Sequence, residues 1–355
     1  MSEKLWRKNF IDIEPYVAGE QSKNPDIIKL NANENPYPPS PKVQEILSEF
    51  NSGMLRKYPS ADASQLKIAL AELQGVNPEN VFVGNGTDDV LATAFRGFFN
   101  SELPIVYPDI TYSFYPVWCN LLKIPCKTIP VDDNFKINVE DYYAPNGGVV
   151  IPNPNAPTAI GEGEDFIIDL LEHNQDCVVI IDEAYADFSG YSCVELINKY
   201  ENLLVTHTFS KSRSMAGMRI GVAYGSAELI QVLYAVKDSY NSYPLDSVAI
   251  ETGIASVKDN DYFLKTVSKV SETRDKAMEK FREMGFSVTD SKANFIFVSH
   301  EKYSAKEIFE YLKSKDIFIR YFNKPRIDNW LRITIGTEEE MDALYREVEN
   351  FLTSK

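Results

Sequence analysis

Short apolar runs alternate along the chain with helical patterns. Val81-Phe82-Val83 predicts a strand, and the apolar positions that follow it up to Phe98 predict a helix. Further apolar runs, each too short for a helix, predict strands at residues 104–106, 149–151, 177–181, 203–205 and 220–223, with another helix near 112–121. Strands that are apolar throughout and separated by helices indicate an α/β domain with a mostly parallel sheet covered on both faces.

The last third of the chain has a mixed pattern. A long helical pattern runs from residue 261 to 284 and stops at Gly285, a residue suited to the position after a helix. Strands are expected at 294–298, 317–321 and 330–335, and helices at 305–314 and 338–352. The beginning of the chain is rich in Asn and Pro and is typical of an extended arm. We therefore expect an arm at 1–35, a large domain at 36–245 and a small domain at 246–355.

Composition and charge narrow the class of protein. The chain has 355 residues, 44% of them hydrophobic and 25% charged, which is ordinary for a folded protein of roughly two domains. The 36 Lys and Arg residues against 52 Asp and Glu residues give a net charge of −16. This excess argues against binding to nucleic acid or to an anionic membrane surface, both of which attract basic patches.

Cysteine and histidine usage predicts neither a metal site nor an oxidising compartment. Four cysteines show no metal-binding spacing, and the three histidines lie far apart in the sequence. Few cysteines in a long chain suit the reducing cytosol. The first residues lack the apolar stretch of a signal peptide, and no run approaches the roughly 18 apolar residues of a spanning helix. We therefore expect a cytoplasmic enzyme without a metal.

In open α/β sheets, ligands gather where the strands end. The segment Gly84-Asn85-Gly86-Thr87-Asp88 follows the first strand and opens a helix. Glycines let backbone N–H groups approach a ligand, a helix N-terminus favours an anion, and Thr87 suits both an N-cap and a hydroxyl donor. An ordinary capped turn would account for the same motif, so this segment alone does not establish a site.

Two further strand ends carry polar residues. Asp182 follows an apolar strand, where a carboxylate is costly without a partner. It is either a buried cap or salt bridge, or an anion held against a cationic ring nitrogen, with Tyr185 donating to the same ring. Lys211 follows the next strand and is either a surface charge or a Schiff-base nucleophile, which needs a desolvated amine. In the second case Ser210 and Arg219 would flank it as phosphate ligands.

Together these residues form an ordered set: Asn155, Asp182, Tyr185, Ser210, Lys211 and Arg219. The set resembles the pyridoxal-phosphate enzymes of the aspartate-aminotransferase fold, fold type I, over the chain from about residue 30 to its end. Within that match, the segments 31–36 (Asn-Ala-Asn-Glu-Asn-Pro), 58–59, 321–323 and 331–337 resemble the histidinol-phosphate aminotransferases. The resemblance implies a large domain with a mostly parallel sheet plus a smaller α/β domain.

The resemblance also implies a pyridoxal 5′-phosphate site. Lys211 would bind the cofactor covalently and carry the proton to and from the substrate Cα, Asp182 would keep the ring nitrogen protonated, and Tyr185 would donate to the ring 3-oxygen. Tyr112 would stack on the ring, although a core aromatic is the other interpretation. The cofactor phosphate would lie on the backbone of Gly86, Thr87 and Asp88, beside Ser210 and Arg219. Tyr58 would reach the phosphate of the neighbouring subunit, which makes the active unit a homodimer.

Two segments depart from the family pattern. The family has Asn-Asn-Pro-Thr-Gly where this chain has Asn155-Ala156-Pro157-Thr158-Ala159, so its second Asn, which meets the ring 3-oxygen, is Ala156. Either Asn155 makes that contact from the adjacent position or Tyr185 makes it alone. The second departure is the segment 241–245, where relatives often have an Asn near the lysine-bearing site.

Substrate residues are also implied by the resemblance. Arg332 matches the arginine that clamps a substrate carboxylate in the fold at large, and Arg320 matches a second arginine suited to a bulkier phosphate. Tyr16 and Asn33 match arm residues that close over the substrate. The function implied is amino transfer between glutamate and imidazole-acetol phosphate. The alternatives are a threonine-phosphate decarboxylase, an aromatic amino-acid aminotransferase and, less compatibly with the intact residue set, a pyridoxal-phosphate protein without catalysis.

Overall fold

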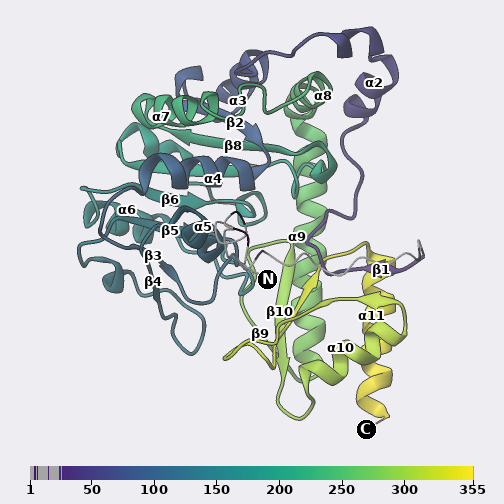
Figure 1. The fold of residues 1–355 in the computed structure, drawn as a ribbon. Helices are drawn as coiled ribbons and strands as arrows, with labels where there is room; N and C mark the ends of the chain where they lie inside the picture. The colour runs from purple at the N-terminus through teal and green to yellow at the C-terminus, as the bar shows by residue number, and fades with distance from the viewer. Residues whose placement is uncertain (1–3, 5, 7–14, 16–23, 25, 355) are drawn as a thin grey trace.

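The structure is a computed structural model that describes residues 26–354 together with residues 4, 6, 15 and 24 (Figure 1). A seven-stranded sheet has the order β2-β8-β7-β6-β5-β3-β4. Its strands are β2 (Val81–Asn85), β3 (Ile105–Pro108), β4 (Cys126–Ile129), β5 (Gly148–Pro152), β6 (Val179–Asp182), β7 (Leu203–Thr208) and β8 (Ile220–Gly225). Only β8 runs antiparallel to its neighbours, so β2, β3, β5, β6 and β7 all end at the same edge.

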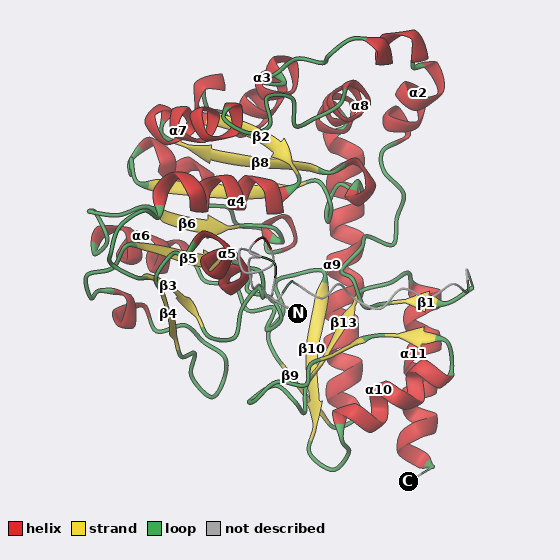
Figure 2. Cartoon of the chain, in the orientation of Figure 1, coloured by secondary structure: helices red, strands yellow, loops and turns green. Residues whose placement is uncertain are grey.

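Helices cover both faces of this sheet (Figure 2). They are α2 (Pro41–Glu49), α3 (Ser64–Gln74), α4 (Thr87–Phe98), α5 (Tyr115–Leu122), α6 (Glu164–Glu172), α7 (Ala227–Asp238) and α8 (Ser247–Lys258). Alternate strand residues point to opposite faces. Val81 and Val83 therefore pack with α3, α6 and α8, whereas Phe82 packs with α4, α5 and α7. Burial on both faces explains the apolar runs of the inner strands β5 and β6, whereas the edge strand β4 is largely exposed.

Short 3₁₀ helices connect several of these elements. They are η1 (Ser52–Arg56), η2 (Pro78–Asn80), η3 (Val139–Tyr142), η4 (Ala186–Phe188), η5 (Val194–Asn198) and η6 (Ala216–Met218). No helix among the described residues is long and apolar enough to cross a membrane.

A second, four-stranded sheet has the order β12-β13-β10-β9. Its strands are β9 (Phe286–Val288), β10 (Phe295–His300), β12 (Arg320–Tyr321) and β13 (Leu331–Thr334), and its helices are α9 (Asn260–Glu283), α10 (Ala305–Ser314) and α11 (Glu338–Thr353). Ile296 and Val298 of β10 face the helices, whereas Phe295 and Phe297 face the seven-stranded unit and contact Tyr185 and Ile110. The back of this small sheet thus forms one wall of the space between the two units.

The arm joins the second unit through a two-stranded parallel sheet. Strand β1 (Ile28–Lys29) pairs with β11 (Ile317–Phe318), and the Asn33 backbone N–H donates to Thr334 Oγ1 at 2.9 Å. From there the chain passes over the edge where the large-sheet strands end, because Ala32 contacts Lys211. Residues 28–33 of the arm therefore connect β11 and β13 to the loop that follows β7.

The helical and strand patterns of the sequence are confirmed, with four local corrections. The helix expected near 112–121 begins only at Tyr115, which leaves Tyr112 in the preceding loop. The N-cap of α4 is Gly86 rather than Thr87. The strand expected at 317–321 is divided between two sheets, and strands β4 and β9 were not predicted because their patterns are short and partly polar. The division of the chain at residue 245 stays a prediction, although α8, which follows it, packs with the large-sheet core.

Candidate active site

Two adjoining cavities lie at the edge where the large-sheet strands end. The smaller, of about 210 Å³, is lined by residues that follow β2, β6 and β7, among them Thr87, Asp182 and Ser210. The larger, of about 420 Å³, extends to the four-stranded unit and includes Arg320 and Arg332. Both cavities are lined by Ala32, Tyr112, Ala156, Tyr185 and Lys211. Lys211 therefore stands where the two cavities meet.

One end of the smaller cavity is suited to a phosphate. It combines the N-terminus of α4, whose free N–H groups favour an anion, with the Arg219 guanidinium. Arg219 lies 3.5 Å from Ser210 Oγ and 3.6 Å from Asp88 Oδ2. Gly86 has a φ of +80°, and a Cβ there would collide with Arg219, so the backbone and the guanidinium meet only because this residue is glycine.

The opposite end of the smaller cavity holds a buried carboxylate. Asp182 is the last residue of β6 and receives hydrogen bonds from Tyr115 Oη at 2.9 Å, Thr206 Oγ1 at 3.2 Å and the Ala184 backbone N–H at 3.3 Å. Burial raises the pKa of this carboxyl from 3.8 to about 6, although the hydrogen bonds oppose that rise. A cationic partner in the cavity would offset the cost of burying the charge.

Between these two ends, Lys211 and Tyr185 face the junction of the cavities. Lys211 Nζ donates to the Ala32 carbonyl at 3.4 Å and lies 5.7 Å from the centre of the Tyr185 ring. Asn33 Nδ2 donates to the Tyr185 hydroxyl at 2.9 Å. The loop that carries the lysine is itself held by Asn35, whose Nδ2 donates to the carbonyls of Lys211 and Ser212. The arm thus orients both residues.

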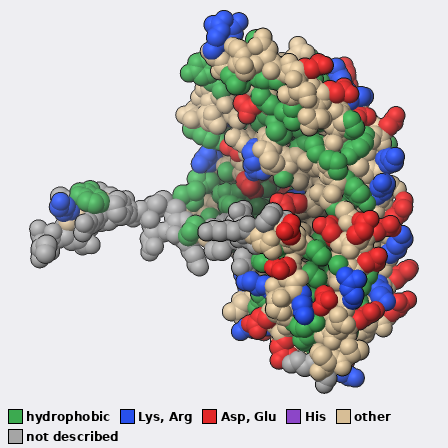
Figure 3. Space-filling model, turned by 90° about the vertical axis from the view of Figure 1, so that its right-hand side faces the viewer, with side chains coloured by type: hydrophobic (Ala, Val, Ile, Leu, Met, Phe, Trp, Pro, Cys, Tyr) green, Lys and Arg blue, Asp and Glu red, His purple; other side chains and the backbone are tan. Residues whose placement is uncertain are grey.

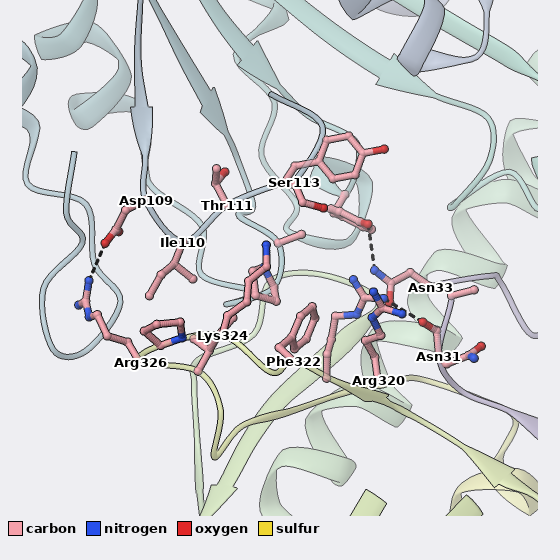
Figure 4. Close-up of a pocket in the computed structure, with 18 of the residues that line it drawn as sticks. Asn31, Asn33, Asp109, Ile110, Thr111, Ser113, Arg320, Phe322, Lys324 and Arg326 are labelled. Carbon is pink, nitrogen blue, oxygen red and sulfur yellow. Dashed lines mark hydrogen bonds and ion pairs between the residues drawn. The ribbon is translucent and has the colours of Figure 1, made fainter. Parts of the chain in front are cut away.

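Basic side chains outnumber acidic ones around the larger cavity, although the chain as a whole has a net negative charge (Figure 4). The basic residues that line it are Lys211, Arg320, Lys324, Arg326 and Arg332, against one carboxylate, Asp109, among the described lining residues. Arg320 and Arg332 are opposite one another in the antiparallel pair of β12 and β13. On the outer surface, by contrast, acidic and basic side chains are interspersed over the lower part of the face shown in Figure 3. The cavity is therefore a local positive hollow that suits an anion.

Comparison with known proteins identifies the family. The sequence profile of the family "Aminotransferase class I and II" matches residues 25–348. The chain belongs to the class I and II aminotransferases. It is 50% identical over 350 residues to a histidinol-phosphate aminotransferase of Lactococcus lactis subsp. cremoris (strain MG1363), covering 99% of this chain and 98% of the relative. It is 51% identical over 350 residues to one of Acinetobacter baumannii (strain SDF), covering 98% and 97%.

A solved structure confirms the fold of this aminotransferase. The crystal structure of histidinol-phosphate aminotransferase from Sinorhizobium meliloti in complex with pyridoxal-5′-phosphate aligns with a TM-score of 0.84 at 24% identity, covering 92% of this chain and 91% of that chain. The expected aspartate-aminotransferase-like fold of type I, with a mostly parallel sheet and a smaller α/β unit, is therefore confirmed.

Two of the described residues expected to contact the cofactor, Asn155 and Tyr58, line neither cavity of this subunit. Asn155 is buried, lines neither cavity, and donates through Nδ2 to the Ile110 carbonyl at 2.8 Å; Ala156 is the residue of that segment that reaches the cavities. Tyr185, the other candidate for the ring 3-oxygen, lines both cavities. Tyr58 is 82% exposed and stacks on Tyr243 at 4.7 Å, away from both cavities. Tyr16 lies outside the described residues.

Tyr112 lines both cavities of the aminotransferase and donates to Asp88 Oδ1 at 2.8 Å. This places its ring beside the phosphate end. The core interpretation also has support, because the ring contacts Phe114, Tyr115 and Trp118. The residue therefore belongs to the edge of an aromatic cluster and also lines the site.

Sequence reasoning missed the partners of Asp182. Thr206 is the register partner of Asp182 in β7, and Tyr115 is the first residue of α5. Both could have been found by asking which neighbouring side chains satisfy a carboxylate at the end of a buried strand. Metal-binding clusters of His, Cys, Asp and Glu are absent from the part of the chain that the structure describes.

Proposed function

We propose that this aminotransferase transfers an amino group between glutamate and imidazole-acetol phosphate, with pyridoxal 5′-phosphate as its cofactor. The observation that carries the proposal is the position of Lys211, at the junction of a cavity suited to a phosphate and a cavity with two arginines on paired strands. Relatives about half identical over almost the whole chain are named histidinol-phosphate aminotransferases, which agrees with it.

The smaller cavity has the groups that pyridoxal phosphate requires. The α4 N-terminus, Ser210 and Arg219 would hold the phosphate, and Asp182 at the other end would face the ring nitrogen. The Tyr185 hydroxyl, which already accepts from Asn33, can donate its own proton to the ring 3-oxygen. When bound, the cofactor supplies an electron sink that stabilises negative charge at the substrate Cα. The raised pKa of Asp182 fits this role, since a cationic ring nitrogen is the partner that its buried carboxylate lacks.

Lys211 is the proton carrier in this proposal. Its amine lies where the substrate Cα must come, between the cofactor end and the arginine end. Nζ takes the proton that leaves Cα and returns it at the end of the transfer. Ala32 and Asn35 hold this residue from the arm side, so the arm orients the amine and limits access of water to it.

Arg320 and Arg332 would receive the anionic end of the substrate. The two guanidinium groups come from opposite residues of β12 and β13, and the Arg332 Nη2 bond to the Asn31 carbonyl ties that pair to the arm. A phosphate carries up to two negative charges, so two arginines suit it better than one. The α-carboxylate of glutamate would take the same place in the other half-reaction. Tyr16 belongs to the same proposal, as an arm residue that closes over the substrate.

The active unit that we propose is a cytoplasmic homodimer. Exposed apolar side chains gather around η1, with Met54 44% and Leu55 60% exposed beside Tyr58. A cluster of exposed apolar side chains, unlike single ones, often marks a surface that binds another protein. In the dimer, Tyr58 of the partner subunit would reach the phosphate end, which lies open on the Arg219 side.

A half-reaction experiment tests the function. Holoenzyme mixed with L-histidinol phosphate should pass from the pyridoxal to the pyridoxamine absorbance, and 2-oxoglutarate should restore the first spectrum. Release of CO₂ from threonine phosphate without that conversion would instead establish a decarboxylase, and conversion with phenylalanine alone would establish an aromatic aminotransferase. Lys211→Ala should abolish turnover; a Lys211→Ala protein that kept full activity would refute the whole proposal.

A further inference from the structure

We propose that Lys324 recognises the side-chain carboxylate of glutamate, and that it is the residue that lets one cavity serve both amino donors. The inference rests on the proposed function, because it assumes that glutamate and a phosphorylated imidazole amine take turns in the same cavity. Lys324 lines that cavity at the end away from the arginine pair. It belongs to a segment that is held in place by contacts with the rest of the protein.

Lys324 belongs to a segment of the second unit that is fixed to the first. Arg326 makes an ion pair with Asp109 Oδ2 at 2.8 Å and donates to the carbonyls of Val131 at 2.7 Å and Asp132 at 2.9 Å. Asp109 in turn accepts from the Val131 backbone N–H at 3.0 Å. The next residue, Ile327, is buried in a cluster that spans the two units. These contacts hold the lysine against the cavity.

The position of Lys324 within the cavity can be followed in Figure 4. Lys324 lies on the wall between Arg326 and Phe322, opposite Ile110, whereas Arg320 lies toward Asn31 and Asn33. The cavity therefore has two ends. One contains the arginine pair, and the other combines the Lys324 amine with the apolar side chains of Ile110 and Ile327.

The ion pairs around the cavity indicate which cation can bind the second carboxylate of glutamate. Glutamate brings two carboxylates, and the arginine pair forms a single site because its members are opposite residues of adjacent strands. Arg326 already faces the Asp109 carboxylate, so its charge is compensated. Lys324 is exposed to the cavity, and no ion pair is formed by its amine within the described part of the chain. It is thus the cation left for the second carboxylate.

The same end can accept an imidazole ring. A neutral ring needs apolar contact, which Ile110 and Ile327 offer. A lysine head is a compact charge on a flexible stem, so it can turn toward solvent when no carboxylate is present. The imidazole substrate therefore gains little from the Lys324 charge, whereas glutamate depends on it. This difference makes the proposal testable, because the two half-reactions should respond differently to one substitution.

The test compares single-turnover half-reactions of Lys324→Gln holoenzyme with wild type. For glutamate, the apparent second-order rate constant should fall on the order of 10- to 100-fold, as expected for loss of one charge-assisted hydrogen bond. For histidinol phosphate it should stay within about threefold, the usual range for a substitution that removes no specific interaction. Lys324→Arg should retain most of the glutamate rate. Lys265→Gln, at an exposed position of α9, is the matched control for charge.

A second measurement keeps the inference separate from the proposed function. Glutamine has nearly the shape of glutamate without the side-chain charge, so wild type should prefer glutamate and Lys324→Gln should lose that preference. An unchanged glutamate-to-glutamine ratio, or equal losses for glutamate and histidinol phosphate, would overturn the role of Lys324. Failure of wild type to convert histidinol phosphate would instead refute the proposed function, and the glutamate ratio would still decide the role of Lys324.

Discussion

Replacing the buried carboxylate should stabilise the cofactor-free protein. In Asp182→Asn the side chain keeps its size but carries no charge. Its amide oxygen can still accept from Thr206 and the Ala184 N–H, and its amide nitrogen can donate to the Tyr115 hydroxyl oxygen, which reverses that one bond. Because burial raises the Asp182 pKa from 3.8 to about 6, ionising this residue costs the folded state more than the unfolded state. The substitution removes that cost, at the expense of the cofactor contact.

The magnitude follows from the pKa. At about 1.4 kcal/mol per pKa unit, a rise from 3.8 to about 6 corresponds to about 3 kcal/mol. Below pH 3.8 the carboxyl is protonated in both states and the cost is absent. Between pH 3.8 and about 6 the folded protein keeps a proton that the unfolded chain has released, so stability falls as pH rises. Above about pH 6 the full cost is present. The amide accepts hydrogen bonds less strongly than the carboxylate, which would reduce this gain in stability by about 1 kcal/mol.

Chemical denaturation of the cofactor-free proteins from pH 4 to pH 8 measures this effect. The free energy of unfolding of Asp182→Asn should exceed that of wild type by about 2 kcal/mol at pH 7.5, with the advantage disappearing toward pH 4. Asp133→Asn, at an exposed position, makes the same charge change and should show no such dependence. If the difference between Asp182→Asn and wild type were constant across this pH range, the reasoning from burial would be wrong.

Three further changes probe other parts of the site. Tyr115→Phe removes a hydrogen bond that lowers the Asp182 pKa, so the pH at which cofactor-free stability levels off should rise; an unchanged or lower pH would contradict the assignment. Arg320→Ala should cost on the order of 2–4 kcal/mol in kcat/KM for histidinol phosphate and much less for glutamate, and equal losses would argue against phosphate recognition. Leu55→Glu places a charge in the exposed apolar patch and should shift sedimentation from dimer to monomer, with weaker cofactor binding because Tyr58 no longer reaches its partner; a variant that stayed dimeric would place the interface elsewhere.

The strand-end residues could be predicted from the sequence because two local signals coincide there. An apolar run marks a buried strand, and the polar residue after it marks the edge of the sheet. Parallel strands then bring Asp182 and Lys211 to the same edge regardless of the distance between them along the chain. The same argument applies to Gly86, which follows β2; Arg219 precedes β8 instead, and its expected place beside the phosphate came from the family resemblance.

The other contacts of the site depend on strand register and loop geometry, which the pattern of apolar and polar residues does not specify. Thr206 reaches Asp182 only because the register of β6 and β7 pairs them, and a shift by one residue would turn Thr206 to the other face. The ion pair of Arg326 with Asp109 joins residues more than 200 positions apart, through a segment without regular structure. The role of Asn155 stays a prediction: its neighbour Ala156 lines the cavity, whereas the Asn155 side chain lies behind it and donates to the Ile110 carbonyl.

The pairing of β1 with β11 has a consequence for how the protein matures in the cell. Ile28 leaves the ribosome early, but its partner Ile317 is made near the end of synthesis; at about 5–20 residues per second, the stretch between them takes about 15–60 s to synthesise. During that interval Asn33 lacks its Thr334 partner. In the nascent chain the arm therefore has no β11 partner, and the loop that carries Lys211 is not held by Ala32 and Asn35. We therefore expect productive loading with cofactor to be a late event, after β11 and β13 have emerged and bound the arm.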